Sequence, residues 1–306
     1  MKIYKPAPIV LFVYNRLWHT KKTIEALKRN ELAKESELFI YSDGPKYKQN
    51  STTVFEVRSY LHEINGFKKI TIIERNKNFG LAKSIIDGVS HTINQFGRVI
   101  VLEDDLVTSP IFLRYMNDAL DLYKDNTEVV SIHGYQYPLE DISYLSDTFF
   151  IKGADCWGWA TWENKWRLFE DDGQKLLDQL KQRKLQKVAD FNNSYGYTKM
   201  LKNEIKGKND SWAIKWYMSA FLHNKLTLYP KKSLVQNIGN DGSGTHVSPT
   251  DQFNIKSLST ILPTFQEHTN VSEDMYARKL MENYFNSIKL TFTKKALKKI
   301  KQIIRL

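Results

Sequence analysis

The sequence predicts an α/β fold built on a mostly parallel sheet, and two observations lead to this prediction. In the first half of the chain, short apolar runs of strand length alternate with stretches of helical composition. Such alternation is typical of a parallel sheet that helices cover on both faces. The chain has 306 residues, 42% of them hydrophobic, so it can bury a sizeable core as one large domain or two intimate halves.

The expected elements can be given in chain order. Strands are expected at 9–14, 38–41, 69–74, 98–102 and 128–132. Helices are expected at 20–28, with Thr20 as a possible N-cap, and at 54–64, 80–96, 110–123 and 211–218. Ligands bind at the carboxyl ends of strands in sheets of this type. Asp43 and Glu103–Asp105 directly follow two of the strands, so we expect them to converge on one cleft.

The amino-acid composition of the chain changes near residue 150. Six of the seven tryptophans lie between Trp157 and Trp216, and a loop rich in Gly, Asn and Asp follows at 237–248. We therefore divide the chain into a half at 1–150, a second half of the same domain at 151–270, and a basic helical tail at 271–306.

Composition excludes several classes of protein. The single cysteine, Cys156, rules out an internal disulfide framework and a cysteine-based zinc site. The N-terminal sequence lacks the features of a signal peptide, and no apolar run is long enough to cross a bilayer. We expect a cytoplasmic protein, soluble or peripheral on the inner membrane face. Of the net charge of +11, seven Lys and Arg without an acid lie at 289–306, so we expect no nucleic acid partner.

The acidic triplet Glu103–Asp105 is the strongest chemical signal. Three carboxylates directly after a buried strand repel one another unless a cation or ligand neutralises them. Hard oxygen ligands suit Mg²⁺ or Mn²⁺, which prefer one or two carboxylates together with diphosphate oxygens and water. The alternative is a solvated acidic turn.

Four segments together resemble the nucleotide-sugar half of GT-A-fold glycosyltransferases. They are the run at 8–16, Ser42-Asp43-Gly44, Asn78-Phe79-Gly80-Leu81-Ala82 and Glu103-Asp104-Asp105. The chain is similar to bacterial family 2-type enzymes and to the N-acetylglucosaminyltransferase I group. Trp157-Gly158-Trp159 and Asn209-Asp210-Ser211-Trp212 resemble that group's acceptor-side motifs. The resemblance covers about residues 7–250 and implies a nucleotide-sugar-binding half at 1–150 and an acceptor-binding, catalytic half at 151–270.

The resemblance also implies residue roles on the donor side. Arg16 would contact the nucleotide or diphosphate, and Asp43 would accept a hydrogen bond from the base imide, which favours uracil. Glu103 would reach the donor sugar, Asp104 the ribose, and Asp105 the metal. From its place after Gly80, Lys83 is a further candidate for the diphosphate, although it could equally face water.

Asp210 is the expected general base, by the resemblance and by chemistry. Direct displacement needs one carboxylate opposite the leaving diphosphate, and partial desolvation before Trp212 would raise the pKa of Asp210. Inversion of stereochemistry follows if it faces the acceptor. Two neighbours differ from the family pattern: Ser211 replaces an acid, and Lys215 matches a basic residue only approximately. The alternative is that Asp210 or Asn209 only caps the next helix.

Aromatic and basic residues suggest the remaining contacts. Trp157, Trp159 and Trp212 are expected to bind the acceptor, because sugar C–H faces pack on aromatic rings. Trp157 and Trp159 would share one side of an extended segment. Trp162, Trp166 and Trp216 are expected in the core. His246 is a candidate metal or diphosphate ligand in a Gly-rich loop, or simply an exposed histidine.

The C-terminal segment 294–306 reads as a short basic amphipathic helix, which favours an anionic membrane surface. Its alternative is an ordinary helix packed on the body. Together these features predict a Mn²⁺- or Mg²⁺-dependent, inverting glycosyltransferase that uses a UDP-sugar and a carbohydrate or lipid-linked glycan acceptor in surface polysaccharide assembly. The rival functions are a sugar-1-phosphate nucleotidyltransferase and a non-catalytic carbohydrate-binding protein. The missing glycine-rich loop at 13–18 argues against the first.

Overall fold

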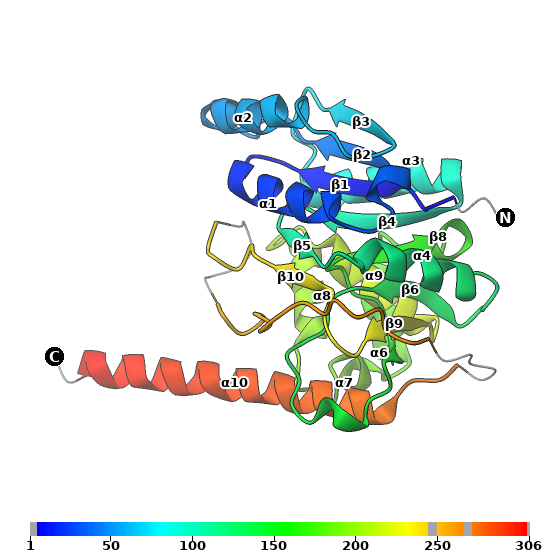
Figure 1. Ribbon diagram of the computed structural model, residues 1–306. Coiled ribbons are helices and arrows are strands. Elements are labelled where there is room, and N and C mark those ends of the chain that lie inside the picture. Colours follow the sequence, from blue (N-terminus) through cyan, green and yellow to red (C-terminus); the bar gives the residue numbers. More distant parts are fainter. Residues whose placement is uncertain (1–4, 244–249, 266–270, 305–306) are drawn as a thin grey trace.

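The computed structural model describes residues 5–243, 250–265 and 271–304, with side chains up to residue 289. One eight-stranded sheet crosses the molecule in the order β3-β2-β1-β4-β8-β6-β9-β7 (Figure 1). Its strands are β1 (Ile9–Val13), β2 (Glu37–Ser42), β3 (Lys69–Glu74), β4 (Arg98–Glu103), β6 (Val129–His133), β7 (Thr148–Lys152), β8 (Trp159–Trp162) and β9 (Leu226–Pro230). Only β8 and β7 run against their neighbours, so the expected mostly parallel α/β sheet is confirmed.

The sheet is covered on both faces because its strands alternate their apolar side chains. In β1, Ile9 and Leu11 point into one hydrophobic cluster, and Val10 and Phe12 point into the other. Helices α1 (Leu17–Lys28), α2 (Ser51–Leu61) and α4 (Phe112–Leu122) supply the first cluster. Helices α3 (Leu81–Phe96) and α9 (Trp212–Leu222) supply the second. A period of two along a strand buried on both faces produces this two-sided core.

Two helix starts differ from the sequence-based expectation. Helix α1 begins at Leu17, so Thr20 lies inside it, and the Thr20 hydroxyl donates to the Arg16 carbonyl at 2.9 Å. Helix α9 is capped by Ser211, whose side chain accepts from the Ile214 N–H, and not by Asp210 or Asn209. The hydroxyl of Ser211 satisfies a free N–H of the first turn and leaves Asp210 available for other contacts.

The second half adds small helices and a second sheet around the large one. The helices are α5 (Glu163–Trp166), α6 (Gly173–Gln182), α7 (Gln186–Ala189) and α8 (Tyr197–Ile205), and β5 (Leu106–Thr108) pairs with β10 (Val235–Asn237). Short 3₁₀ turns complete the chain at Ala33–Glu35, Lys48–Asn50 and Ile142–Tyr144. The pair β5–β10 brings the loop after β10 next to the acidic triplet that ends β4.

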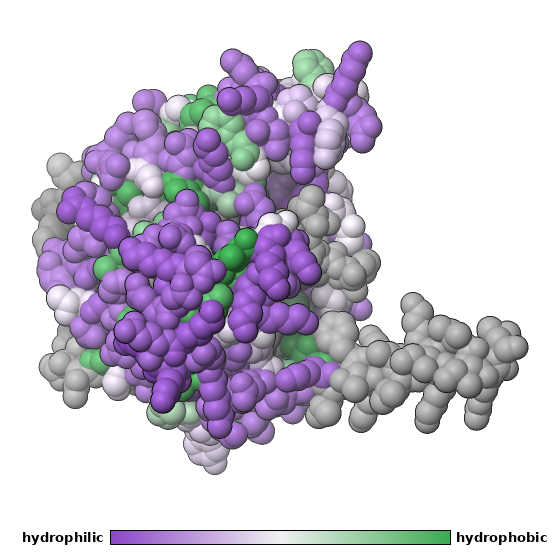
Figure 2. Space-filling view, turned by 180° about the vertical axis from the view of Figure 1, so that it is seen from behind, coloured by the Kyte–Doolittle hydropathy of each residue, from purple (hydrophilic) through white to green (hydrophobic). Residues whose placement is uncertain are grey.

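Helix α10 (Met275–Ile304) runs along the base of the molecule and extends past the body (Figure 1). Its first turns are anchored by Ala277, Met281 and Phe285 in the core. The expected helix at 294–306 is thus the far end of α10, up to residue 304. None of the described helices combines the length and the apolar character that a membrane span requires. The face opposite to that of Figure 1 is mostly hydrophilic where it is described (Figure 2).

Candidate active site

The acidic triplet lies beside the residue that follows β1. Because β1 and β4 are parallel neighbours in the register Phe12↔Glu103, their carboxyl ends lie side by side. Arg16 forms a short ion pair with Asp104, and its guanidinium lies 2.7 Å from Oδ2 of Asp105. The structure therefore brings Arg16 and the triplet together at the sheet edge where ligands bind in parallel α/β folds.

The triplet carries more negative charge than Arg16 offsets. Burial, followed by the charges of Asp105 and Asp104, raises the pKa of Glu103 to about 8. Burial raises the pKa of Asp104 to about 6, although the adjacent Arg16 acts in the opposite direction. Burial lowers the pKa of Arg16, but the charges of Asp104 and Asp105 outweigh it and raise that pKa overall. The negative charge of the triplet is therefore only partly balanced by Arg16.

The donor set of the triplet fits a hard divalent cation that shares its coordination with a second molecule. Mg²⁺ is usually bound through one or two carboxylates plus substrate phosphates and water. Among the described residues, no group of three or more His, Cys, Asp and Glu side chains is placed to hold a metal by itself. Asp105 is the side chain that would hold the cation. His246, the other expected ligand, lies outside the described residues.

The loop after β10 passes directly over Asp105. The Ile238 N–H donates to the Asp105 carbonyl at 2.9 Å, and a Cβ on Gly239 would lie 2.1 Å from Asp105 Oδ2. Only glycine allows this approach. Further along, Asp241 contacts His19 of α1 at 3.0 Å, and hydrogen bonds from Ser243 lower the pKa of Asp241 to about 2. The described start of the Gly-rich loop therefore contacts both Asp105 and helix α1.

Asp43 lies at the carboxyl end of β2 and holds the turn before α3. Its buried carboxylate accepts from the N–H of Phe79 at 2.8 Å and of Gly80 at 3.0 Å. The two segments that the resemblance joined, Ser42-Asp43-Gly44 and Asn78-Phe79-Gly80, are therefore one hydrogen-bonded unit. Lys83 is exposed, and its ammonium lies 5.1 Å from the centre of the Phe79 ring.

Arg75, at the carboxyl end of β3, was not predicted as a site residue. Its guanidinium stacks on Phe79 at 4.0 Å, and its Nη2 donates to Asp87 at 2.6 Å. The side chain is buried, yet its Nη1 has no hydrogen-bond partner among the described residues. A buried N–H without a partner costs free energy, so it marks a donor that a ligand or a water molecule could satisfy. The strand-end rule that singled out Asp43 could have found Arg75 as well.

Asp210 comes from the second half but contacts the first. Its Oδ2 lies 3.4 Å from the Ala82 backbone N, in the first turn of α3, and a Cβ on Gly80 would lie 3.1 Å from the same oxygen. Asp210 is exposed, so the partial desolvation expected from Trp212 is absent. Lys215 points elsewhere and pairs with Asp171 and Glu204. Asp210 thus lies at the carboxyl edge of the sheet with an accessible carboxylate.

The expectation that Trp157 and Trp159 face one side is wrong. Gly158 lies between them at φ +70°, which turns the chain. Trp157 is half-buried and packs against the core on the α1 side. Trp159 and Trp212 are buried on the α3 side, stacked with ring centres 5.3 Å apart. Burial leaves neither ring free for a sugar, so their predicted acceptor role is corrected to a core role. Trp162, Trp166 and Trp216 are buried as expected.

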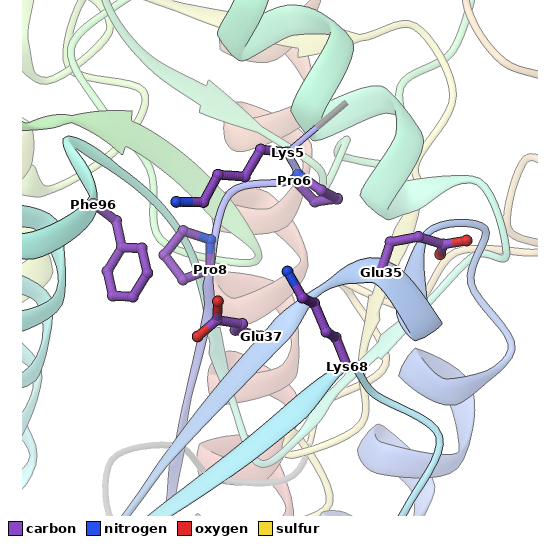
Figure 3. A pocket seen from close by; sticks show the side chains of 7 residues that line it. All are labelled: Lys5, Pro6, Pro8, Glu35, Glu37, Lys68 and Phe96. Atoms are coloured by element: carbon purple, nitrogen blue, oxygen red, sulfur yellow. The ribbon is translucent and has the colours of Figure 1, made fainter. Parts of the chain in front are cut away.

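A small hollow at the opposite edge of the sheet does not compete with this site. It surrounds the start of β1 (Figure 3) and is lined by Lys5, Pro6, Pro8, Glu35, Glu37, Lys68 and Phe96. Its volume of about 10 Å³ is room for roughly one water molecule. A nucleotide-sugar cannot enter it.

The sheet order, the acidic strand end and the loop over it define a GT-A-type α/β fold. Comparison with protein families agrees: the model of "Glycosyl transferase family 2" matches residues 9–192, more than half of the chain. The chain therefore belongs to glycosyl transferase family 2. Enzymes of this family transfer a sugar from a nucleotide-sugar donor to an acceptor. The family assignment argues against the nucleotidyltransferase and the non-catalytic binding protein as alternatives.

Other comparisons are weaker. No curated protein matches the chain. Among solved structures, the mannosyltransferase PcManGT from Pyrobaculum calidifontis, in complex with GDP-Man and Mn²⁺, is 13% identical with a TM-score of 0.30, over 44% of this chain and 37% of that one. S. aureus TarS is 16% identical with a TM-score of 0.28, over 41% of this chain and 21% of that one. The chain spans well under half of either protein, and these scores carry no functional argument.

Proposed function

We propose that this chain is a Mn²⁺- or Mg²⁺-dependent, inverting glycosyltransferase that moves a sugar from a UDP-sugar to a carbohydrate or lipid-linked glycan acceptor. The observation that carries the proposal is the partly buried triplet Glu103–Asp105, whose negative charge exceeds what Arg16 offsets. Membership of glycosyl transferase family 2 supports the reaction class. A role in bacterial surface polysaccharide assembly is part of the same proposal.

In this proposal, each side chain of the triplet binds a different part of the donor complex. Asp105 holds the cation, Asp104 binds the ribose, and Glu103 reaches the donor sugar. The cation supplies positive charge that offsets the charge developing on the departing diphosphate. Arg16 pairs with both aspartates, and it would contact the diphosphate if Asp105 held a cation.

The nucleoside is assigned to the carboxyl edge of the sheet, at the end of β2 and the start of α3. Asp43 accepts from the base imide, and the N–H groups of Phe79 and Gly80 hold its carboxylate in position for that contact. Arg75 supplies the unpaired guanidinium N–H beside it. Lys83, exposed one turn into α3, binds the diphosphate.

Asp210 is proposed as the general base. It takes the proton from the acceptor hydroxyl as that oxygen attacks the anomeric carbon and the diphosphate leaves from the other side. One displacement of this kind inverts the configuration at the anomeric carbon. Its exposure and its contact with the first turn of α3 support the assignment, because an acceptor can reach the carboxylate.

A donor screen tests the reaction class and the metal together. Each of a set of UDP- and GDP-sugars is incubated with the full chain and Mn²⁺, and release of nucleoside diphosphate is measured without acceptor. We expect release from one UDP-sugar and its loss in EDTA. Release that EDTA does not change, or none from any donor, contradicts the proposal. Pyrophosphate released from UTP and a sugar-1-phosphate would instead support the nucleotidyltransferase.

Replacing the proposed base tests the catalytic assignment. Asp210→Asn should lower transfer by about 10²- to 10⁴-fold, the usual contribution of a general base. UDP binding in the presence of Mn²⁺, measured by calorimetry, should stay as in the wild type. Asp178→Asn, at an exposed position on α6, is the matched control. Transfer by Asp210→Asn at the wild-type rate rules out Asp210 as the base.

The basic end of α10 is proposed to lie on an anionic membrane surface, on the cytoplasmic side. Its sequence at 294–306 carries six Lys and Arg, no acid, and apolar residues at helical spacing. The helix extends past the body, where a lipid-linked acceptor would give such contact a use (Figure 1). Sedimentation with phosphatidylglycerol vesicles should carry the chain down at low salt. The chain should stay in the supernatant with phosphatidylcholine vesicles. A variant in which Lys294, Lys295, Lys298 and Lys299 are replaced by Gln should stay there even with phosphatidylglycerol vesicles. Equal sedimentation under all three conditions contradicts the proposal.

A further inference from the structure

A second carboxylate, Asp155, lies at the same sheet edge as the triplet and has no role in the proposal above. It belongs to the loop 153–158 that joins β7 to β8. Strand β8 runs antiparallel to β4 with Val101 opposite Trp159. Glu103 and Trp157 each lie two residues beyond that pair on the same side, so the loop ends beside the triplet.

The electrostatics of Cys156 agree with this placement. Burial raises the pKa of its thiol well above the ordinary value, and the charges of Asp155, Glu103 and Asp105 raise it further. Charges from the loop and from the triplet therefore both act on this thiol, which agrees with a loop that ends beside the triplet.

Two glycines fix the loop at its ends. Gly153 has φ +100°, and a Cβ there would lie 2.5 Å from the Tyr217 ring. Gly158 has φ +70°, and a Cβ there would lie 2.8 Å from Val235. Both positions combine the left-handed backbone region with a close approach that only glycine allows. The loop is thus held in one shape before any ligand arrives, which lowers the entropic cost of binding.

Neutral donors hold the Asp155 carboxylate. Its Oδ2 accepts from the hydroxyls of Tyr137 at 2.9 Å and Tyr229 at 3.3 Å, and its Oδ1 accepts from the Cys156 N–H at 2.8 Å. Burial, and then the charge of Asp155, raises the pKa of both tyrosines, so they remain protonated donors.

No strong donor among the described residues fills the second acceptor position on Oδ1. His133 Nε2 lies 4.0 Å from Oδ1 but accepts the Trp157 N–H at 3.2 Å, so this nitrogen offers no proton to Asp155. A carboxylate oxygen can accept two hydrogen bonds; Oδ1 accepts the Cys156 N–H, and the further hydrogen bond to this carboxylate comes from the Cys156 thiol, a weak donor that a hydroxyl can replace. The exposed fraction of the Asp155 side chain is 17%, enough for a hydroxyl to reach it.

The neighbouring ring completes a site for a sugar. Trp157 is half-buried and held edge-on by Tyr135 at 4.7 Å and Phe253 at 5.5 Å between ring centres. A carboxylate that accepts from hydroxyls, next to an indole that packs on C–H groups, is a combination suited to a pyranose. Asp155 and Trp157 come from one rigid loop, so their spacing is fixed.

We propose that Asp155 is an acceptor-binding, specificity-determining residue: its Oδ1 accepts a hydrogen bond from one hydroxyl of an acceptor pyranose that lies against Trp157. The contact sets which other hydroxyl of that sugar faces the donor. The inference rests on the proposed glycosyl transfer, and it assigns to Asp155 a task different from the proton transfer of Asp210.

The test uses octyl glycosides as acceptor probes. Octyl glucoside, galactoside, mannoside and N-acetylglucosaminide are supplied to the full chain with Mn²⁺ and the UDP-sugar found in the donor screen. Asp155→Asn should raise the acceptor KM by roughly 10- to 100-fold, the loss expected for a hydrogen bond to a charged group. Its donor KM and its acceptor-free hydrolysis should match the wild type, which also shows that the variant folds.

Two controls separate acceptor binding from loop anchoring. Tyr137→Phe and Tyr229→Phe remove the partners of Oδ2 and leave the carboxylate in place, so each should raise the acceptor KM less than Asp155→Asn does. Monodeoxy versions of the best octyl glycoside identify the hydroxyl concerned. Removing it should raise the wild-type KM and leave the KM of Asp155→Asn unchanged.

The possible outcomes are distinct. Donor hydrolysis together with an acceptor KM for Asp155→Asn equal to that of the wild type overturns this inference and leaves the proposed function standing. So does hydrolysis that no glycoside of the panel converts into transfer by the wild type, or phenylalanine variants that reproduce the full effect of Asp155→Asn. Absence of any donor hydrolysis counts against the proposed function instead.

Discussion

The triplet Glu103–Asp105 and the loop carboxylate Asp155 lie at one edge of one sheet, but their surroundings differ. At the triplet, one guanidinium pairs with Asp104 and Asp105, and burial together with the charges of these two aspartates raises the pKa of Glu103 to about 8. Asp155 has three neutral hydrogen-bond donors and partial exposure. An excess of buried negative charge favours a cation, whereas a satisfied carboxylate with a spare lone pair favours a hydroxyl. The partners of a carboxylate therefore indicate its ligand better than its residue type does.

The largest difference between the two centres should appear in turnover. Asp105→Asn should lower transfer and donor hydrolysis alike by about 10²- to 10³-fold, the loss seen when a group that stabilises developing charge is removed. Asp155→Asn should leave hydrolysis intact. Nucleoside diphosphate release with and without acceptor measures both. Glu140→Gln, at an exposed acid, is the control. Wild-type hydrolysis by Asp105→Asn would place the cation elsewhere.

A second effect should appear in the stability of the loop that holds Asp155. Gly153→Ala combines strain at φ +100° with a clash against Tyr217, and should lower the free energy of unfolding by about 2–5 kcal/mol. Gly97→Ala is the matched control, because Gly97 has φ +74° but open space around it. It should lose only the strain, about 1–2 kcal/mol. Equal losses in urea unfolding would mean that Tyr217 does not constrain the loop.

The smallest effect concerns His133, next to Asp155. Burial lowers the pKa of His133, against a smaller effect of Asp155, so the folded state holds the ring neutral. The unfolded chain binds this proton near pH 6.5, so stability is full above that pH and falls as the pH drops toward the folded-state pKa. The slope from this group is at most about 1.4 kcal/mol per pH unit.

His133→Gln removes the titrating ring and provides the comparison. The difference in free energy of unfolding between wild type and variant should shrink from pH 7.5 to pH 5, measured in urea. A difference that stays constant over this range would show that His133 is not held neutral by burial.

Sequence patterns predicted the position of the strand-end acids better than the burial of the tryptophans. Alternating strands and helices place Asp43 and the triplet at strand ends, because the carboxyl ends of parallel strands share one edge. Residue type alone does not say whether a tryptophan is buried: Trp159 and Trp212 stack inside the core. The positive φ of Gly158, which separates Trp157 from Trp159, has no sequence signal beyond the glycine itself.

Two of the proposed site residues could be found only with the structure. Arg75 follows a strand, as Asp43 does, but its unpaired Nη1 is visible only once Phe79 and Asp87 are in place. The position of the Asp155 carboxylate depends on hydrogen bonds from Tyr137 and Tyr229, which lie 18 and 74 residues away in the chain. Contacts between residues so far apart follow from strand order across the sheet, which a single sequence does not specify.

Calorimetric titration with UDP tests most directly whether the triplet takes a cation together with the nucleotide. Wild-type protein in Mn²⁺ should bind UDP at least about tenfold more tightly than in EDTA, a coupling of about 1.4 kcal/mol. Asp105→Asn should lose that difference. UDP binding of equal strength with and without Mn²⁺ in the wild type would contradict the account.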